Sequence, residues 1–240
     1  MNKCFFAVDL GATSGRTIIG GINDGKIELK ELTRFPNNLI EINGHHTVFL
    51  DSFMWLLTQK TIWIPLYCSM LYVVWRNYGW RGALQILVMI ALGMLVTDWA
   101  NSQFLRPAIG RLRPNNPENP VFSLLYRVND VRGGGFGFPS AHSANNWMLT
   151  FMLYYWLRDR WTIITMSVFS LLICYSRVYL GYHYPGDILG GFVLAALTVG
   201  VITWLHGHYL HFEKVPEPKL TWMPAFFISI ILVFFAAASA

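Results

Sequence analysis

Residues 176–206 read SRVYLGYHYPGDILGGFVLAALTVGVITWLH, a short polar stretch followed by an apolar run from Asp187 to His206. An apolar run of roughly 20 residues is what one helix needs to cross the hydrocarbon core of a bilayer. The run is therefore predicted to be a membrane-spanning helix. A carboxylate at its start is informative, because an ionised side chain at membrane depth is costly and usually has a functional role.

Similar apolar stretches, some shorter or containing a polar residue, lie at about 59–75, 83–100, 142–157, 162–176 and 222–240. The predicted fold class is thus all-α, a polytopic membrane helical bundle of about six spans. The segment 47–58 is expected to lie along the membrane interface. Hydrophobic residues make up 54% of the chain and charged residues 13%. This composition argues against a disordered chain, a coiled coil and a nucleic-acid partner.

Basic residues in short connections predict how the chain crosses the membrane. They cluster in three turns, which contain Arg76 and Arg81, Arg158 and Arg160, and Lys214 and Lys219. Turns rich in Lys and Arg usually face the cytoplasm, so loops 101–141 and 177–186 are expected on the opposite side. The first of these loops is also rich in arginine, which indicates an anion-binding site. The alternative is an inverted topology.

Three short segments carry residues suited to phosphate chemistry: Arg106-x6-Arg113-Pro114, Pro139-Ser140-Ala141-His142 and Ser176-Arg177-x5-His183-x3-Asp187. All lie at or beside the non-cytoplasmic ends of predicted spans, so we expect them to meet at one surface. The guanidinium groups of Arg106, Arg113 and Arg177 can each bind two phosphate oxygens. Ser140 is placed to cap the next helix, whose free N–H groups would face the anion.

His183 is the predicted nucleophile of this surface. Asp187 can hold one imidazole nitrogen as N–H and leave the other free to attack phosphorus. His142 can then protonate the leaving oxygen, while the arginines counter the charge on the phosphoryl group, so that no metal or other cofactor is required. Taken singly, these residues also fit headgroup anchors, an interfacial histidine and a helix cap. Their joint spacing favours catalysis.

The three segments resemble the signature motifs of the type 2 phosphatidic acid phosphatase family, which includes phosphatidate, undecaprenyl-diphosphate and lipid A phosphatases. The resemblance covers about residues 43–240. It implies a helical bundle that hydrolyses a lipid phosphate monoester or diphosphate through a phosphohistidine, without metal. It also implies the residue roles given above, with His183, His142 and Asp187 catalytic, and with Arg106, Arg113, Ser140 and Arg177 binding phosphate.

Two positions depart from the family pattern. Arg106 replaces the usual Lys of the first motif, which keeps the charge, so we expect activity to survive. Ala141 replaces the usual Gly before the motif histidine, and its methyl group puts the rate and the accepted substrate size in doubt.

The amino-terminal stretch has a different character, with strand-like runs and a second hairpin expected around Asn23-Asp24-Gly25. The segment Ala7–Arg16 is similar to the first phosphate-binding hairpin of rhamnulokinase-type sugar kinases, and this resemblance ends near Asn43. The remaining parts of a kinase have no counterpart, and so short a fragment lacks the surface to fold alone or hold ATP. We therefore expect residues 1–45 to form a β-hairpin appendage without kinase activity, and residues 46–240 to form the membrane phosphatase.

The sequence thus predicts an integral protein of the bacterial inner membrane whose site faces the non-cytoplasmic side and whose partner is a lipid phosphate. The alternatives are a phosphatase of soluble phosphoesters, a non-catalytic anion-binding or transport protein, and a cytosolic sugar kinase. Weaker candidates remain. Asp98 lies in a span without an obvious partner, Arg111 and Arg132 either attract anions or are solvated, and His206-x-His208-x2-His211 fits an interfacial role better than a metal site.

Overall fold

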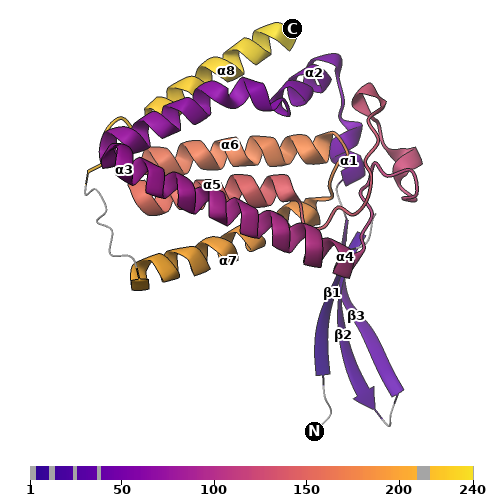
Figure 1. The fold of residues 1–240 in the computed structure, drawn as a ribbon. Coiled ribbons are helices and arrows are strands. Elements are labelled where there is room, and N and C mark those ends of the chain that lie inside the picture. Colours follow the sequence, from indigo (N-terminus) through magenta and orange to yellow (C-terminus); the bar gives the residue numbers. More distant parts are fainter. Residues whose placement is uncertain (1–3, 11–13, 24–25, 37–38, 210–216, 240) are drawn as a thin grey trace.

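A computed structural model describes residues 4–10, 14–23, 26–36, 39–209 and 217–239 of the chain. Figure 1 shows a body of helices packed side by side and a narrow sheet that projects from one end of it. The strands are β1 (Cys4–Leu10), β2 (Ser14–Asn23) and β3 (Lys26–Pro36). The longer helices are α2 (Val48–Leu57), α3 (Ile64–Trp99), α5 (Ala141–Leu157), α6 (Arg160–Tyr179), α7 (Pro185–Tyr209) and α8 (Met223–Ser239).

Shorter helical segments connect these elements. They are α1 (Leu39–Gly44), the 3-10 helix Lys60–Trp63, the π-helix Ala100–Leu105, α4 (Arg106–Ile109) and the 3-10 turns Phe122–Leu124 and Val128–Asp130. Three helical stretches within the described residues are long and apolar enough to cross a membrane: Lys60–Ile109, Arg160–Tyr179 and Pro185–Tyr209. The mostly helical fold with a β appendage is therefore confirmed, and six crossings remain a prediction.

Helix α3 contains two of the predicted spans and is broken between them. At Gly79 the backbone has φ 66° and ψ 179°, a conformation that favours glycine because it lacks a Cβ atom. The Asn77 side chain next to the break donates to the carbonyl of Lys219 at 3.0 Å and accepts from its N–H at 2.7 Å. The break between Arg76 and Arg81 thus coincides with the basic turn that the sequence predicts, and it is tied to the segment before α8.

Helices α5 and α7 approach each other closely at their amino-terminal ends. A Cβ atom at Gly191 would lie 2.5 Å from the Ser140 carbonyl oxygen and 2.7 Å from the Ser143 Cβ atom. Only glycine therefore fits at this point of α7. The Ser143 hydroxyl donates to the Ile188 carbonyl at 2.7 Å across the same contact. The close backbone contact and this hydrogen bond hold the starts of α5 and α7 together, although they are more than forty residues apart in sequence.

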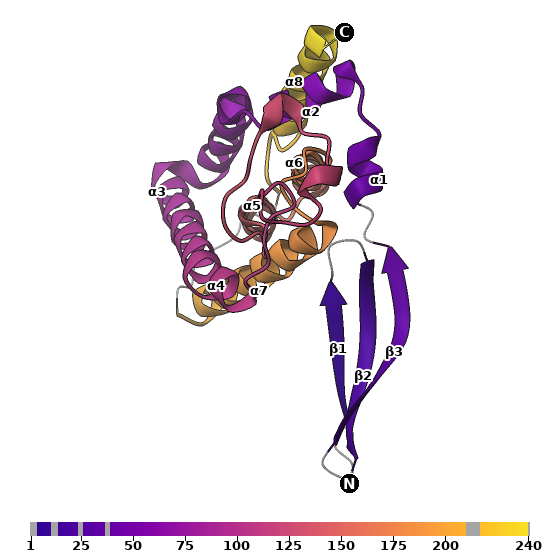
Figure 2. The ribbon, with the colours of Figure 1, turned by 90° about the vertical axis from the view of Figure 1, so that its right-hand side faces the viewer.

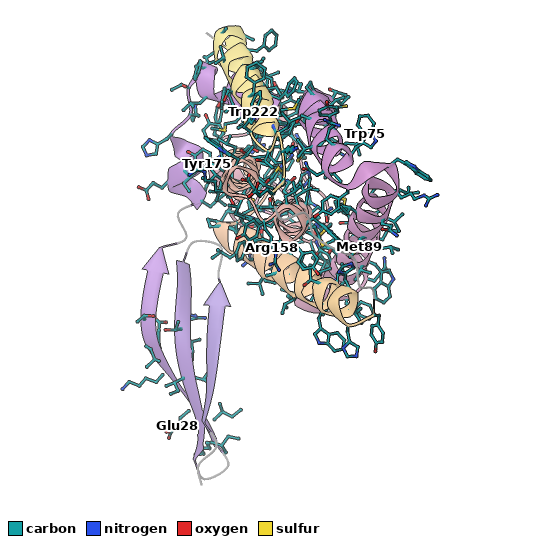
Figure 3. All side chains as sticks on the ribbon, turned by 90° about the vertical axis from the view of Figure 1, so that its left-hand side faces the viewer. Glu28, Trp75, Met89, Arg158, Tyr175 and Trp222 are labelled. Atoms are coloured by element: carbon teal, nitrogen blue, oxygen red, sulfur yellow. The ribbon has the colours of Figure 1, made fainter. Side chains whose placement is uncertain are left out.

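The amino-terminal sheet is antiparallel, with strand order β1-β2-β3 (Figure 2). Leu10 pairs with Gly15, and Asn23 pairs with Lys26, which is the register of two successive hairpins. The predicted turn residues 11–13 and 24–25 lie outside the described residues. Figure 3 shows Glu28 on the part of the sheet far from the helical body.

Candidate active site

His183 and Asp187 form the centre of the site. His183 lies in the turn between α6 and α7, and Asp187 lies in the first turn of α7. The His183 Nδ1 atom is 3.3 Å from the Asp187 Oδ2 atom, and the two residues are only 1% and 0% exposed. Because the carboxylate accepts the Nδ1 proton, the Nε2 lone pair is left for a reacting group.

Burial lowers the pKa of His183 from its ordinary value of 6.5, because the charged imidazolium is poorly solvated there. The nearby Asp187 carboxylate opposes this shift, whereas the positive charges of Arg113 and Arg106 reinforce it. The net effect keeps the imidazole of His183 neutral at neutral pH. A neutral imidazole is the form that can act as a nucleophile.

Ser140 connects the start of α5 to this pair. Its hydroxyl caps the helix by accepting from the Ser143 N–H at 3.4 Å, which confirms the predicted N-cap. Its own N–H donates to the Asp187 carbonyl at 2.9 Å. The capping and the close contact at Gly191 place the positive end of the α5 dipole beside Asp187 and His183. Direct contact between the Ser140 hydroxyl and a phosphate remains a prediction.

His142 follows in the first turn of α5 and is exposed, whereas His183 is buried. Its side chain opens into a cavity, whereas His183 is enclosed. His142 interacts electrostatically with Arg177, His183 and Arg113. The two histidines expected to act together are thus brought to one site from α5 and the α6–α7 turn.

The three arginines predicted to bind phosphate also converge on this site. Arg106 donates to the Pro139 carbonyl at 3.5 Å and Arg113 to the Phe136 carbonyl at 3.3 Å. Arg177 is 8% exposed and lies over the Tyr182 ring at 5.5 Å. The Nε atoms of Arg106 and Arg177 are buried and find no hydrogen-bond acceptor among the described residues. Buried guanidinium N–H groups without acceptors indicate a position for an anion.

Arg111 has a role that the sequence analysis missed. It forms an ion pair with the Oδ1 atom of Asp187, and its guanidinium lies about 5 Å from the Phe138 and Tyr184 ring centroids. A usable signal was its spacing from Arg113, because residues two apart in an extended chain share a face. Arg132, in contrast, pairs with exposed Asp130 at 3.2 Å, which agrees with the solvated alternative.

The loop that carries Arg111 and Arg113 is held in place by Asn119. The buried Asn119 side chain donates to the carbonyls of Leu112 at 3.2 Å and Arg113 at 3.0 Å, and it also bonds the Tyr184 hydroxyl. Since Tyr184 immediately follows His183, this amide connects the arginine loop to the turn that contains His183. The convergence of distant segments therefore has a defined structural cause.

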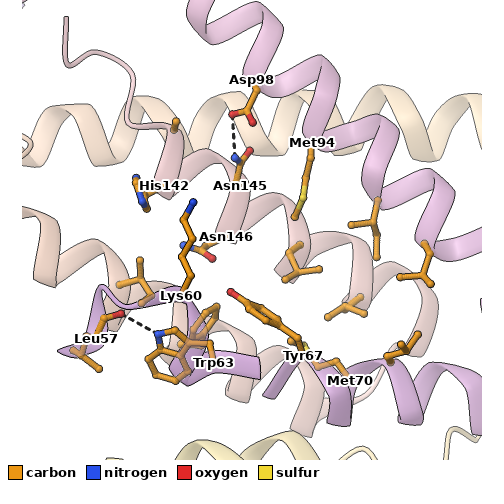
Figure 4. Close-up of a pocket in the computed structure, with 18 of the residues that line it drawn as sticks. Leu57, Lys60, Trp63, Tyr67, Met70, Met94, Asp98, His142, Asn145 and Asn146 are labelled. Atoms are coloured by element: carbon orange, nitrogen blue, oxygen red, sulfur yellow. Dashed lines mark hydrogen bonds between the residues drawn. The ribbon is translucent and has the colours of Figure 1, made fainter. Parts of the chain in front are cut away.

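A cavity of about 590 Å³ opens beside His142 (Figure 4). Its walls come from α3, α5, α6 and the segment before α3, and most of them are apolar. Polar groups gather at one end, namely Lys60, Asp98, His142, Asn145, Asn146 and Arg177. Asp98 accepts a hydrogen bond of 3.0 Å from the Asn145 amide, which supplies the partner that the sequence did not reveal.

The histidines near the end of α7 contact aromatic side chains. His206 bonds the Tyr155 hydroxyl at 2.9 Å through Nδ1, and His208 stacks on Trp204 at 5.7 Å. His211 lies outside the described residues. Among the residues that the structure does describe, no group of three or more His, Cys, Asp or Glu side chains is arranged to hold a metal ion.

Comparisons with known proteins identify relatives of the helical part of the chain. A model of the PAP2 superfamily matches residues 82–210. A lipid A 4'-phosphatase from Bacteroides thetaiotaomicron is 47% identical over 173 residues, which are 72% of this chain and 75% of that protein. The crystal structure of a transmembrane PAP2 type phosphatidylglycerolphosphate phosphatase from Bacillus subtilis shares the fold, with a TM-score of 0.50, 22% identity, and coverage of 73% of this chain and 87% of its own.

The amino-terminal stretch matches a different protein. A rhamnulokinase from Bacteroides thetaiotaomicron is 62% identical over 45 residues. Those residues are 19% of this chain but 9% of the kinase. The likeness to the kinase is therefore confined to a short segment.

Proposed function

The chain belongs to the PAP2 superfamily, and from this premise we propose that it removes a phosphate monoester from a sugar-based membrane lipid of the lipid A type. As a PAP2 phosphatase it is an integral membrane, metal-independent enzyme that acts on lipid phosphates. The relative with 47% identity is a lipid A 4'-phosphatase, which supports this choice of lipid over phosphatidate or a polyprenyl diphosphate.

The cavity beside His142 carries the proposal. It joins the group expected to protonate the leaving oxygen to a long apolar space between α3, α5 and α6. A soluble phosphoester would leave that apolar space unfilled, whereas acyl chains would bury apolar surface in it. The apolar walls include Met70, Val74, Ile86, Ile90, Leu153 and Ile173.

The proposed first half of the reaction transfers the phosphoryl group to the enzyme. The His183 Nε2 lone pair attacks phosphorus, and the bond between phosphorus and the bridging oxygen breaks. Protonated His142 gives its proton to that oxygen, which leaves as the lipid hydroxyl. Arg106, Arg113 and Arg177 bind the three non-bridging oxygens and counter the charge that is spread over them in the transition state.

The second half releases phosphate. Neutral His142 accepts a proton from a water molecule as the water oxygen attacks the phosphohistidine. The bond between phosphorus and nitrogen breaks, and His183 recovers its lone pair. Asp187 keeps the Nδ1 proton of His183 in place through both halves, so the ring does not need to change tautomer.

The experiment is phosphate release from a purified sample against a panel of lipid and soluble phosphates, with trapping of phosphate on the protein. His183→Ala should abolish both release and trapping, and His208→Ala, which replaces an exposed histidine far from the site, should leave both intact. The trapped bond should be acid-labile and base-stable. Activity of the wild-type chain should persist in EDTA. Full activity of His183→Ala would refute the mechanism, and binding without phosphate release would favour an anion-binding or transport protein.

We also propose that the site faces the non-cytoplasmic side. The Tyr78 hydroxyl donates to the Trp156 carbonyl at 2.7 Å, and Asn77 bonds Lys219, so three basic turns lie together at one end of the bundle. His142 is at the opposite end of α5, about 25 Å away for a helix of 17 residues.

A single-cysteine chain with Glu118→Cys should react with a membrane-impermeant thiol reagent added to intact cells. Labelling only after cell lysis would support the inverted topology.

A further inference from the structure

We propose that Lys60, Asp98 and Asn145 form a subsite for the leaving group and that they recognise the hydroxyl and amide groups of a sugar. This inference rests on the proposed function, because it assigns the part of the same site that would distinguish a sugar-based lipid from other lipid phosphates. None of the three residues belongs to the motifs that the sequence singled out for phosphate chemistry.

The position of the subsite follows from which residues line the cavity. His142 and Arg177 line it, whereas His183, Asp187, Arg106 and Arg113 do not. Because His183 is enclosed and His142 faces the cavity, we infer that a phosphate bound between the two histidines has the nucleophile on one side and the cavity on the other. Since in-line attack expels the leaving group on the side opposite the nucleophile, the cavity holds the leaving group. Residues at its polar end then contact the atoms nearest the bridging oxygen.

Lys60 and Asp98 approach this polar end from opposite ends of the same helical stretch. Figure 4 shows the Lys60 side chain extending between Trp63 and His142, with Asp98 above it and Asn145 between them. Lys60 acts electrostatically on His142, and Asp98 acts electrostatically on Arg106. Both charged groups are thus close to the phosphate position without being part of it.

Neither charged group has an ion-pair partner in direct contact among the described residues. Among the described residues, Lys60 and Asp98 form no ion pair, and the Asn145 amide is the hydrogen-bond partner of Asp98. Both side chains are exposed in the structure. When the acyl chains of a substrate fill the cavity and displace water, the two charges become costly unless the substrate supplies hydrogen-bond partners. A ligand with both donors and acceptors close to the scissile oxygen meets this need.

The chemistry of the two groups selects among lipids. A carboxylate accepts hydrogen bonds from hydroxyl and amide N–H groups, and an ammonium group donates to hydroxyl and carbonyl oxygens. A sugar that carries amide-linked acyl chains offers all of these groups beside its phosphate. A polyprenyl chain offers none of them, and a diacylglycerol offers only ester oxygens. A second phosphate beside the first would meet repulsion from Asp98.

The test compares three phosphate monoesters in mixed micelles: an acylated glucosamine phosphate, phosphatidate and a polyprenyl phosphate. The variants are Lys60→Met and Asp98→Asn in the full chain, with Lys219→Met as the control that removes a lysine charge at the other end of the bundle. Inhibition by orthovanadate, a phosphate analogue, reports whether the phosphate site is intact. The wild-type chain should have its highest kcat/KM on the sugar lipid.

Both variants should lower kcat/KM on the sugar lipid about tenfold, and on the other two lipids less than about twofold. Their inhibition by orthovanadate and the kinetics of Lys219→Met should be unchanged. An equal loss on all three lipids, or no loss on any, would overturn the subsite, because the side chains would then act generally or not at all. A wild-type chain that releases phosphate from none of the lipids would instead overturn the proposed function itself.

Discussion

The carboxylate of Asp187 is fully buried and is surrounded by three donors from two segments. Its Oδ2 atom accepts from the Tyr184 N–H at 2.8 Å and lies 3.3 Å from the His183 Nδ1 atom. Its Oδ1 atom pairs with Arg111. Arg111 is thus the cation that balances this buried charge, and it acts on the nucleophile only through Asp187.

Replacing Arg111 should therefore destabilise the fold and slow the reaction. Arg111→Met leaves Asp187 charged and buried without its ion-pair partner, which costs roughly 3 kcal/mol. We expect a lower thermal midpoint and a kcat at least tenfold below wild type, with KM little changed because Arg111 does not bind substrate. Arg111→Lys should recover part of both losses. A large rise in KM with normal kcat would show instead that Arg111 contacts the substrate.

The lowered pKa of His183 predicts how activity depends on pH. As the pH falls, activity is lost when His183 takes up a proton, and burial moves this point below the ordinary value of 6.5. The acid limb of kcat/KM against pH should therefore lie below pH 6.5. Because Asp187 raises the pKa of His183, Asp187→Asn should shift the acid limb further toward low pH, in addition to lowering the rate. A limb above pH 6.5 would contradict a buried, neutral nucleophile.

Residue spacing accounts for what the sequence could and could not predict at this scale. His183 and Asp187 are four residues apart at a helix start, so their contact follows from local geometry. Arg111 and Asp187 are 76 residues apart, and their pairing depends on how the arginine loop folds back through Asn119. No short-range pattern encodes such a contact. The partnership of Asp98 with Asn145 on another helix was missed for the same reason.

At the level of elements, the contact of α5 with α7 determines whether the site assembles. His142 lies on one helix and Asp187 on the other, and Gly191 lets the two backbones meet at the level of Ser140. A side chain at Gly191 would push the helices apart beside His142 and Asp187, the two groups for which we propose catalytic roles.

Gly191→Ala tests this contact, with Gly200→Ala as its control on the same helix. The new methyl group at 191 would meet backbone atoms at 2.5 and 2.9 Å, whereas a methyl group at 200 meets nothing within 4 Å. Gly191→Ala should cost about 1–3 kcal/mol of stability and lower kcat at least tenfold, because catalysis is sensitive to small displacements. Gly200→Ala should be neutral or stabilising by up to about 1 kcal/mol. Equal thermal midpoints and rates for the two variants would contradict the account.

Element positions were largely predictable because apolar runs and basic turns are strong signals. Each predicted span overlaps a helix, and the predicted turn between Arg76 and Arg81 coincides with the break at Gly79. The π-helix Ala100–Leu105 and α4 were not anticipated. They continue the helical stretch past its apolar run to Ile109, and hydrophobic patterning does not predict the backbone conformation of these residues.

At the scale of the whole molecule, the sheet and the helical body differ in how their side chains are covered. Several large apolar residues of β2 and β3 are exposed, including Ile22, Ile27 and Leu29. Helix α1, although it precedes the predicted domain boundary at residue 45, is covered. Leu39 is fully buried in a cluster with Val121, Leu125, Val178 and Tyr184.

Asn43 of α1 also bonds the helical body at three points. Its side-chain amide donates to the carbonyls of Tyr126 at 2.9 Å and Tyr179 at 2.8 Å, and its oxygen accepts from the Tyr126 N–H at 2.8 Å. Tyr179 ends α6 just before the turn that contains His183. The bonds of Asn43 therefore help to hold this turn in place. The likeness to the kinase covers 45 residues, but we propose that the structural boundary between the sheet and the helical body lies between Pro36 and Leu39.

Two truncated chains distinguish this boundary from the one predicted at residue 45. Removal of residues 2–36 should leave phosphate release and the thermal midpoint close to those of the full chain, because the sheet carries no group of the site. Removal of residues 2–45 should lower the midpoint by several degrees and reduce activity, since it exposes the cluster around Leu39 and leaves two buried carbonyl groups and one N–H group without Asn43. Asn43→Ala in the full chain should reproduce part of that loss, which separates the role of the amide from any effect of chain length.

If both truncated chains match the full chain in activity and midpoint, α1 is dispensable and the boundary at residue 45 stands. The segment that matches rhamnulokinase is only 9% of that kinase. We therefore expect that neither the full chain nor its variants bind ATP.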